Sequence, residues 1–188
     1  MFKTLSLAAA FIGCTAILSA QAVTADADTF KVNYYTNPGT CDSTIRMTDA
    51  GTTAANGGDL CAAIYVFDPH QELAECCSCE LTPDGLRTLS LRTDLLDNTL
   101  TGVIPSSGVI KILSAALTAG GCPLPTKPVP AAGVRAWATH VQTGPTYTET
   151  AFVDAGLSAA ELSRLGSECS AIQLVGSGKG VCSCGSGD

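Results

Sequence analysis

The sequence predicts a mainly β fold: an antiparallel β-sandwich of short strands with one C-terminal α-helix, stapled by disulfides. Three observations predict it. Short apolar runs rich in β-branched residues recur between turn signals, one amphipathic helical pattern stands near the C-terminus, and the 188 residues include ten cysteines. Short strands separated by turns favour sheets packed face to face over a fold with helical crossovers.

The first 22 residues predict a secretory signal peptide. Lys3 gives a short positive start, residues 5–18 form an apolar core, and Ala20-Gln21-Ala22 has the small residues of a cleavage site. Cleavage after Ala22 leaves residues 23–188, which we expect to form a single β-rich secreted domain, periplasmic or extracellular.

A lipid anchor at Cys14 is a rival interpretation of the same segment, because residues 11–14 loosely resemble the site at which bacterial lipoproteins are cut. Phe11 stands where that process usually has leucine, which favours the signal peptide. Cleavage after Ala25 or Ala27 is a further alternative. No later apolar run reaches the about 18 residues of a transmembrane helix, so we expect none.

The expected mature chain is acidic. Lys3 is the only charged residue among the first 22, so residues 23–188 carry 9 basic and 17 acidic side chains, a net charge of −8. Phosphate contacts need concentrated positive charge, and no cluster of Lys and Arg is present. We therefore expect no nucleic-acid partner and an extracellular partner or ligand of unspecified kind.

Strands are expected wherever alternating or β-branched apolar runs end at turn residues. The expected strands cover residues 29–35, 41–48, 60–67, 73–81, 86–93, 107–113, 134–141 and 146–153. The first should place Phe30, Val32 and Tyr34 on one face. Residues 49–59 form a polar loop, and Thr82-Pro83-Asp84-Gly85 forms a turn.

The hairpin of residues 60–81 holds four cysteines and is the centre of the predicted fold. Side chains alternate along a strand, so Cys77 and Cys79 share a face and Cys76 points to the other. Whether Cys61 shares a face with the first pair or with Cys76 depends on the register of the turn, which the sequence leaves open.

The only clear helix is predicted to begin at Ser158. Ser158 and Glu161 fit a capping box, and Leu157 with Leu162 fits a hydrophobic staple. Apolar residues then recur at three- and four-residue spacing, and Cys169 lies on this stripe. We therefore expect Cys169 to be a structural disulfide or a packed thiol.

Residues 122–133 hold four prolines and are predicted to be a stiff surface connection within one domain. Proline lacks the N–H group that a central strand needs, so the segment should not continue a sheet. A proline-rich ligand for an aromatic groove is the alternative.

Nine cysteines remain after removal of the signal peptide, and an oxidising compartment favours about four disulfides. The disulfide candidates are Cys41, Cys61, Cys76, Cys77, Cys79, Cys122, Cys169, Cys182 and Cys184. Because nine is odd, one thiol is free, forms an intermolecular disulfide, or binds another group.

The two C-x-C pairs are the best metal candidates, Cys77 with Cys79 and Cys182 with Cys184. Alternate residues of an extended strand lie about 6.6 Å apart. Two sulfurs on one tetrahedral zinc lie only about 3.8 Å apart. We therefore expect no metal and no cofactor, but two parallel disulfides that lock the C-terminal tail onto the second hairpin strand.

Catalytic signals are weak. Glu75 and Glu80 flank the first C-x-C pair, and acidic neighbours disfavour a reactive thiolate. No G-x-S-x-G motif is present, His70 lies in a turn, and His140 should pack on the face of Ala136. The sequence therefore assigns no catalytic residue; whether the protein is an enzyme stays open, and a non-catalytic role is favoured.

Several segments together resemble a group of uncharacterised, exported bacterial proteins. They are DLCAAIYVFDPHQELAECCSC, TPDGLRTLS, SGVIKIL, RAWATH, LSAAEL and GSGKGVCSC. The resemblance covers most of the mature chain. It implies secretion and a shared cysteine framework, and it carries no activity.

The sequence as a whole predicts a non-catalytic secreted or cell-surface protein with a structural or binding role. The alternative is a cysteine-based metal-binding or redox protein. A hydrolase is a third option, and it would need a pocket that contains His140 or His70 beside a serine or an aspartate.

Overall fold

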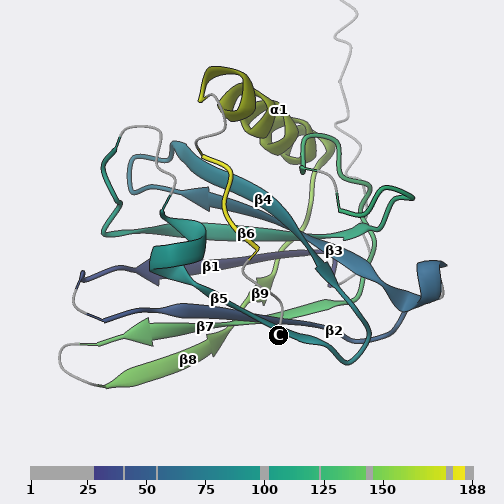
Figure 1. Ribbon diagram of the computed structural model, residues 1–188, viewed down its shortest axis with the longest axis horizontal. Coiled ribbons are helices and arrows are strands. Elements are labelled where there is room, and N and C mark those ends of the chain that lie inside the picture. Colours follow the sequence, from purple (N-terminus) through teal and green to yellow (C-terminus); the bar gives the residue numbers. More distant parts are fainter. Residues whose placement is uncertain are drawn as a thin grey trace, which may run out of the picture.

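The computed structural model describes residues 28–39, 41–53, 55–97, 102–122, 124–142, 146–176 and 180–184. The expected signal peptide, the anchor at Cys14 and the alternative cleavage sites lie outside these residues. Two antiparallel sheets pack face to face, and one α-helix covers the outer face of the upper sheet (Figure 1). The predicted fold class is confirmed: the described chain is a mainly β sandwich with a C-terminal helix and four disulfides.

The strands have these bounds: β1 Phe30–Thr36, β2 Thr44–Asp49, β3 Leu60–Phe67, β4 Leu73–Leu81, β5 Leu86–Ser90, β6 Ser107–Ala116, β7 Val134–Val141, β8 Tyr147–Ala151 and β9 Val153–Asp154. One sheet has the strand order β4-β3-β6-β1-β9, and the other has the order β5-β2-β7-β8. A short 3₁₀ helix, η1 (Ala55–Gly58), precedes β3. No helix among the described residues is long and apolar enough to cross a membrane.

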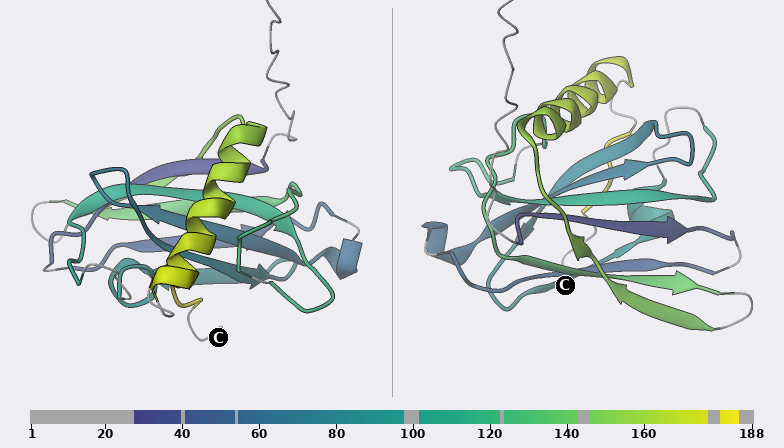
Figure 2. Two further views of the ribbon diagram at one scale, coloured as in Figure 1. Left: turned by 90° about the horizontal axis from the view of Figure 1, so that it is seen from above. Right: turned by 180° about the vertical axis from the view of Figure 1, so that it is seen from behind.

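Strand β3 is buried along its whole length because both of its faces are covered. Ile64 and Val66 face the core between the two sheets. Tyr65 and Phe67 face a second apolar layer, under the helix α1 (Ala159–Val175). The helix crosses the sheet diagonally in the view from above (Figure 2). The double coverage explains why this strand reads as a continuous apolar run instead of an alternating one.

Helix α1 begins where the sequence predicts. The Ser158 Oγ accepts the backbone N–H of Glu161 at 3.0 Å, Leu157 is buried, and Leu162 packs against the same cluster. The Glu161 carboxylate does not complete the capping box. It accepts Lys111 Nζ at 2.6 Å and the Arg164 guanidinium, whose hydrogen bond is the main reason that the pKa of Glu161 lies below its usual value. These ion pairs tie the helix to β6.

Strand β5 ends at Ser90, three residues before the end of the predicted strand. Leu91–Leu95 form a π-helical turn, η2, with Leu91 and Leu95 buried. The Ser90 Oγ accepts the N–H of Thr93 at 3.0 Å, and the Ser90 N–H donates to Asp94 Oδ2 at 2.6 Å. Side chains that bond to nearby backbone in this way compete with strand pairing.

The predicted strand of residues 146–153 is two strands. Tyr147–Ala151 pairs with β7 in one sheet, whereas Val153–Asp154 pairs with β1 in the other. Phe152 lies between them, and its side chain is buried in the core between the sheets. The chain therefore changes sheets at this residue, which closes that side of the sandwich.

The proline-rich connection forms more backbone pairing than its composition predicts. Pro130 lies opposite Ala115 of β6. The N–H of Ala116 donates to Val129 O, and the N–H of Ala131 donates to Ser114 O, both at 2.9 Å. As predicted, the described part of the segment forms no strand of either sheet, and this bridge is isolated. Residues beside the proline make the hydrogen bonds that proline itself does not.

Candidate functional site

Eight cysteines form four disulfides within the described chain. The bonded pairs are Cys61 with Cys122, Cys76 with Cys169, Cys77 with Cys182, and Cys79 with Cys184. Cys41 is half-buried and has no disulfide partner among the described residues. It is the odd thiol that the count of cysteines predicts, and an intermolecular bond through it stays a prediction.

Adjacent cysteines of β4 point into different layers, as strand alternation predicts. Cys77 and Cys79 lie in the core between the sheets, and Cys76 lies in the layer under α1, where it meets Cys169. Cys61 lies directly opposite Glu80 of β4. Glu80 and Cys76 are four residues apart and point to the same face of the strand, so Cys61 shares the face of Cys76. Its partner, Cys122, lies 61 residues away, and no pattern in the sequence pointed to it.

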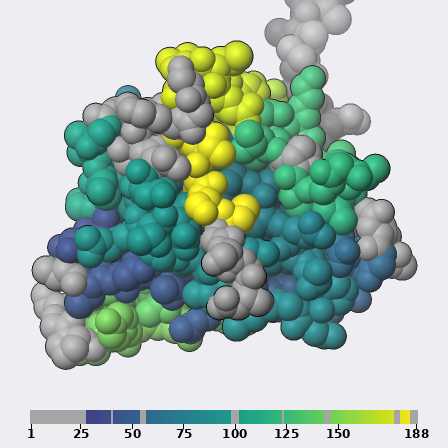
Figure 3. All heavy atoms as spheres, in the orientation of Figure 1, coloured from purple at the N-terminus to yellow at the C-terminus, as the bar shows by residue number. Residues whose placement is uncertain are grey.

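The C-terminal tail lies beside the edge strand β4, and Val181 forms a parallel bridge with Cys76. The tail, in yellow, lies on the face of the molecule that Figure 3 shows. The Cys76 N–H donates to Gly180 O at 2.8 Å, and the Cys182 N–H donates to Cys76 O at 3.3 Å. Arg87 Nη1 donates to Cys184 O at 2.7 Å. The predicted locking of the tail onto this strand is confirmed. The tail also covers part of an exposed strand edge, which would otherwise favour pairing between molecules.

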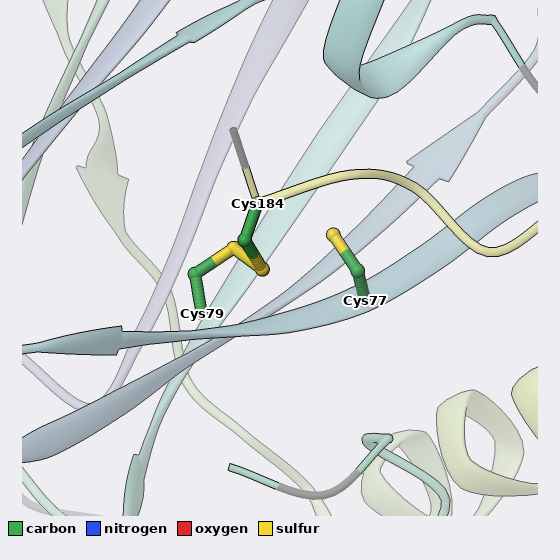
Figure 4. Close-up of side chains that lie close together, drawn as sticks. All are labelled: Cys77, Cys79 and Cys184. Atoms are coloured by element: carbon green, nitrogen blue, oxygen red, sulfur yellow. A yellow bond between two sulfur atoms is a disulfide. The ribbon is translucent and has the colours of Figure 1, made fainter. Parts of the chain in front are cut away.

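Three sulfurs of this arrangement form a cluster. The Sγ atoms of Cys77, Cys79 and Cys184 all lie within 4.8 Å of one another, with Cys77 and Cys79 rising from β4 toward the tail (Figure 4). The two parallel disulfides predicted between the C-x-C pairs bring Cys79 and Cys184 together, whereas the approach of Cys77 to that bond was not predicted. All three are in disulfides, however, and a metal ligand is a thiolate. With both bonds closed, the cluster braces the fold.

A groove of about 480 Å³ lies between the β3–β4 turn and the segment before β6. Both segments lie at the left end of the sandwich in Figure 1. The apolar lining of the groove consists of Pro69, Leu73, Ala74, Val103, Ile104 and Pro105, and its polar lining consists of Asp68, His70, Glu72 and Ser106. Val103 and Ile104 are 67% and 56% exposed. Neighbouring apolar side chains left in solvent beside a groove are typical of interaction sites.

The wall of this groove is fixed by its own hydrogen bonds. Asp68 Oδ1 accepts the backbone N–H groups of His70 and Glu72, both at 2.9 Å. The Asp68 N–H donates to Glu72 O, and the Gln71 N–H donates to Asp68 O. Gln71 has a φ of 71°, in the left-handed region. Asp68 therefore orders the turn in which the sequence places His70.

Buried polar groups lie close behind the groove. Glu75 follows Ala74 along β4, and its side chain is fully buried. The Tyr35 hydroxyl is also buried and has no hydrogen-bond partner within the described residues. Burial, and then the negative charges of Asp68 and Glu75, raise the pKa of Tyr35. Asp68, Glu75 and the Tyr35 hydroxyl therefore lie close enough to interact at this end of the sandwich.

The histidines do not complete a hydrolytic site. His70 lines the groove together with Asp68 and Ser106, but among the described residues its ring has no hydrogen bond to either. His140 is buried: its Nε2 lies 2.7 Å from Thr150 Oγ1, and its ring stacks on Tyr34 at 4.1 Å. A serine nucleophile needs contact with its base, and the described residues of the groove show no such contact.

His140 predicts a pH dependence of stability. Its Nδ1 has no partner among the described residues, and burial lowers its pKa from the usual 6.5. Below pH 6.5 the histidine of the unfolded chain is protonated, whereas His140 in the folded chain stays neutral until the pH reaches its lower pKa. The free energy of unfolding should therefore fall as the pH drops from 6.5 toward the folded pKa. Urea unfolding at several pH values should show this slope, and His140→Gln should flatten it. An equal slope in both proteins would contradict the assignment.

Comparison of the chain with family models, with curated proteins and with solved structures finds no match.

Proposed function

We propose that this protein is an exported, non-catalytic binding protein whose disulfide-braced sandwich presents the groove of the β3–β4 turn to a small ligand. The observation that carries the proposal is the groove itself, about 480 Å³ in volume, lined mainly by apolar side chains with a few polar groups at fixed positions. Ligand sites in proteins commonly have this size and composition.

The covalent framework supports both parts of the proposal. Strand β4 leaves the groove at Leu73 and reaches three bonded cysteines within six residues, at Cys76, Cys77 and Cys79. A groove wall anchored by disulfides loses little conformational entropy when a ligand binds, and a small entropy loss favours high affinity. Four disulfides also suit an oxidising compartment. They agree with the predicted signal peptide and with the cysteine framework of the exported proteins that the sequence resembles.

Ligand-detected NMR with a mixture of neutral, cationic and anionic fragments tests the proposal. We expect some fragments to bind the wild-type protein and to lose binding in Ile104→Lys, which places a charge on the apolar wall. Leu174→Lys is the matched control, because Leu174 is 84% exposed on α1, away from the groove lining. Absence of binding to the wild type, or equal loss in both variants, would contradict a binding role for the groove.

A cysteine-based metal or redox role is the second candidate, and the sulfur cluster of Cys77, Cys79 and Cys184 favours it. Reduction of two adjacent disulfides would place four thiols, including Cys182, on β4 and the tail. Elemental analysis and a free-thiol count on the purified native protein separate the two functions. Stoichiometric metal, or three or more free thiols, would favour the second candidate over the first.

A further inference from the structure

We infer that the groove of the β3–β4 turn selects an organic cation, an ammonium group carried on an apolar body. This inference rests on the proposed binding function and specifies its ligand class. It follows from the placement of charge and of apolar surface around the groove.

The groove carries two carboxylates, Asp68 and Glu72, and neither Lys nor Arg is among its described lining residues. Two carboxylates four residues apart therefore line the same small volume. A concave site with charge of one sign and apolar walls concentrates ligands of the opposite sign.

The nearest basic side chains on β6 and α1 are already paired. Lys111 and Arg164 lie over the ring of Phe67, the residue before Asp68, at 5.1 and 5.2 Å. Lys111 Nζ lies 2.6 Å from Glu161, and Arg164 forms ion pairs with Glu161 and Glu168. Their charges are thus offset locally by carboxylates, and the acidic residues of the turn keep their attraction for an incoming cation.

Asp68 has the geometry of a fixed receptor for a positive charge. Two backbone N–H groups hold its Oδ1. Its Oδ2 accepts no hydrogen bond within the described part of the chain and is left for a ligand. A hydrogen bond between charged partners is roughly twice as strong as a neutral one, so an ammonium group gains most from this oxygen.

The remaining lining explains why the cation needs an apolar body. Leu73 and Ala74 form one side of the groove, and Val103, Ile104 and Pro105 form the other. A ligand chain between them removes apolar side chains from water, which a small inorganic cation does not do. The site therefore suits an alkylammonium or arylalkylammonium ligand better than a metal ion.

Three probes of one shape test this inference by calorimetric titration of the full chain: 4-phenylbutylammonium, the neutral 4-phenylbutanol, and 5-phenylpentanoate. We expect the ammonium probe to bind about ten-fold more tightly than the alcohol, and the carboxylate more weakly than either. Asp68→Asn, which keeps the acceptor of the turn, and Glu72→Gln should each weaken ammonium binding several-fold and leave alcohol binding unchanged.

Glu80→Gln is the matched control, because it removes an exposed charge from the other end of β4 and should leave all three affinities unchanged. Equal affinities for the ammonium probe and the alcohol would overturn the choice of a cation and leave the binding function intact. If none of the three probes binds and the fragment mixture also gives no signal, the proposed function itself fails.

Discussion

Replacing Cys76 and Cys169 together by alanine is expected to lower the free energy of unfolding by about 2 to 5 kcal/mol. The bond joins β4 to α1 across a sequence separation of 93 residues, so its loss releases a long loop in the unfolded chain. Both side chains are fully buried in the layer under the helix, so the substitution also removes packed atoms. Guanidinium unfolding under non-reducing conditions measures the change.

Hydrogen exchange gives this prediction a local readout. The amides of α1 should lose protection before those of β3, because the helix depends on this bond while β3 is held by strands on both sides. The control is the double variant at Cys61 and Cys122, which removes the bond between β3 and the start of the proline-rich connection and keeps the bond between β4 and the helix. It should lower stability and leave α1 protected. Unchanged protection of α1 in the first variant would contradict the role of the bond as its anchor.

Gly166→Ala is expected to destabilise the protein by about 1 to 3 kcal/mol, through overpacking. Replacing an exposed helical glycine by alanine normally raises the free energy of unfolding by roughly 0.5–1 kcal/mol. A decrease at position 166 would therefore identify overpacking by its sign alone. In this helix a Cβ atom at position 166 would lie 2.2 Å from Thr126 O, on the backbone of the proline-rich connection. The buried Tyr65 hydroxyl donates to Pro125 O at 2.9 Å, which limits how far the connection can move away.

Gly156→Ala is the control for this substitution, because a Cβ atom there meets no other atom within 4 Å. It should change the unfolding free energy little. Thermal and chemical unfolding of the two variants side by side measures the difference. A Gly166→Ala protein as stable as the wild type would show that α1 does not rest closely on the connection.

The hairpin and the cysteine faces could be predicted because local rules govern them. Strand alternation alone separates Cys76 from Cys77, and the capping pattern at Ser158 marks the start of α1. The register of Cys61 needed the turn geometry, and the Asp68 side chain sets that geometry through hydrogen bonds that composition does not reveal.

The groove was not predictable from the sequence, because it needs two segments that lie about 30 residues apart. Val103 and Ile104 are the apolar pair that the sequence shows at the groove, and such a pair is equally typical of the start of an ordinary strand. The change of sheet at Phe152 was also not predictable, because it too depends on contacts between segments distant in the sequence. Strand propensity is continuous across that residue, and only the packing of its ring into the core separates β8 from β9.

The central claim is that four specific disulfides, and not reactive thiols, account for the cysteines of the folded protein. Alkylation of the native protein followed by peptide mapping without reductant tests it most directly. Of the cysteines in residues 23–188, we expect only Cys41 to be alkylated, with the peptide of Cys182 and Cys184 linked to that of Cys77 and Cys79. Alkylation of all nine cysteines, or a C-terminal peptide that separates freely, would contradict the account.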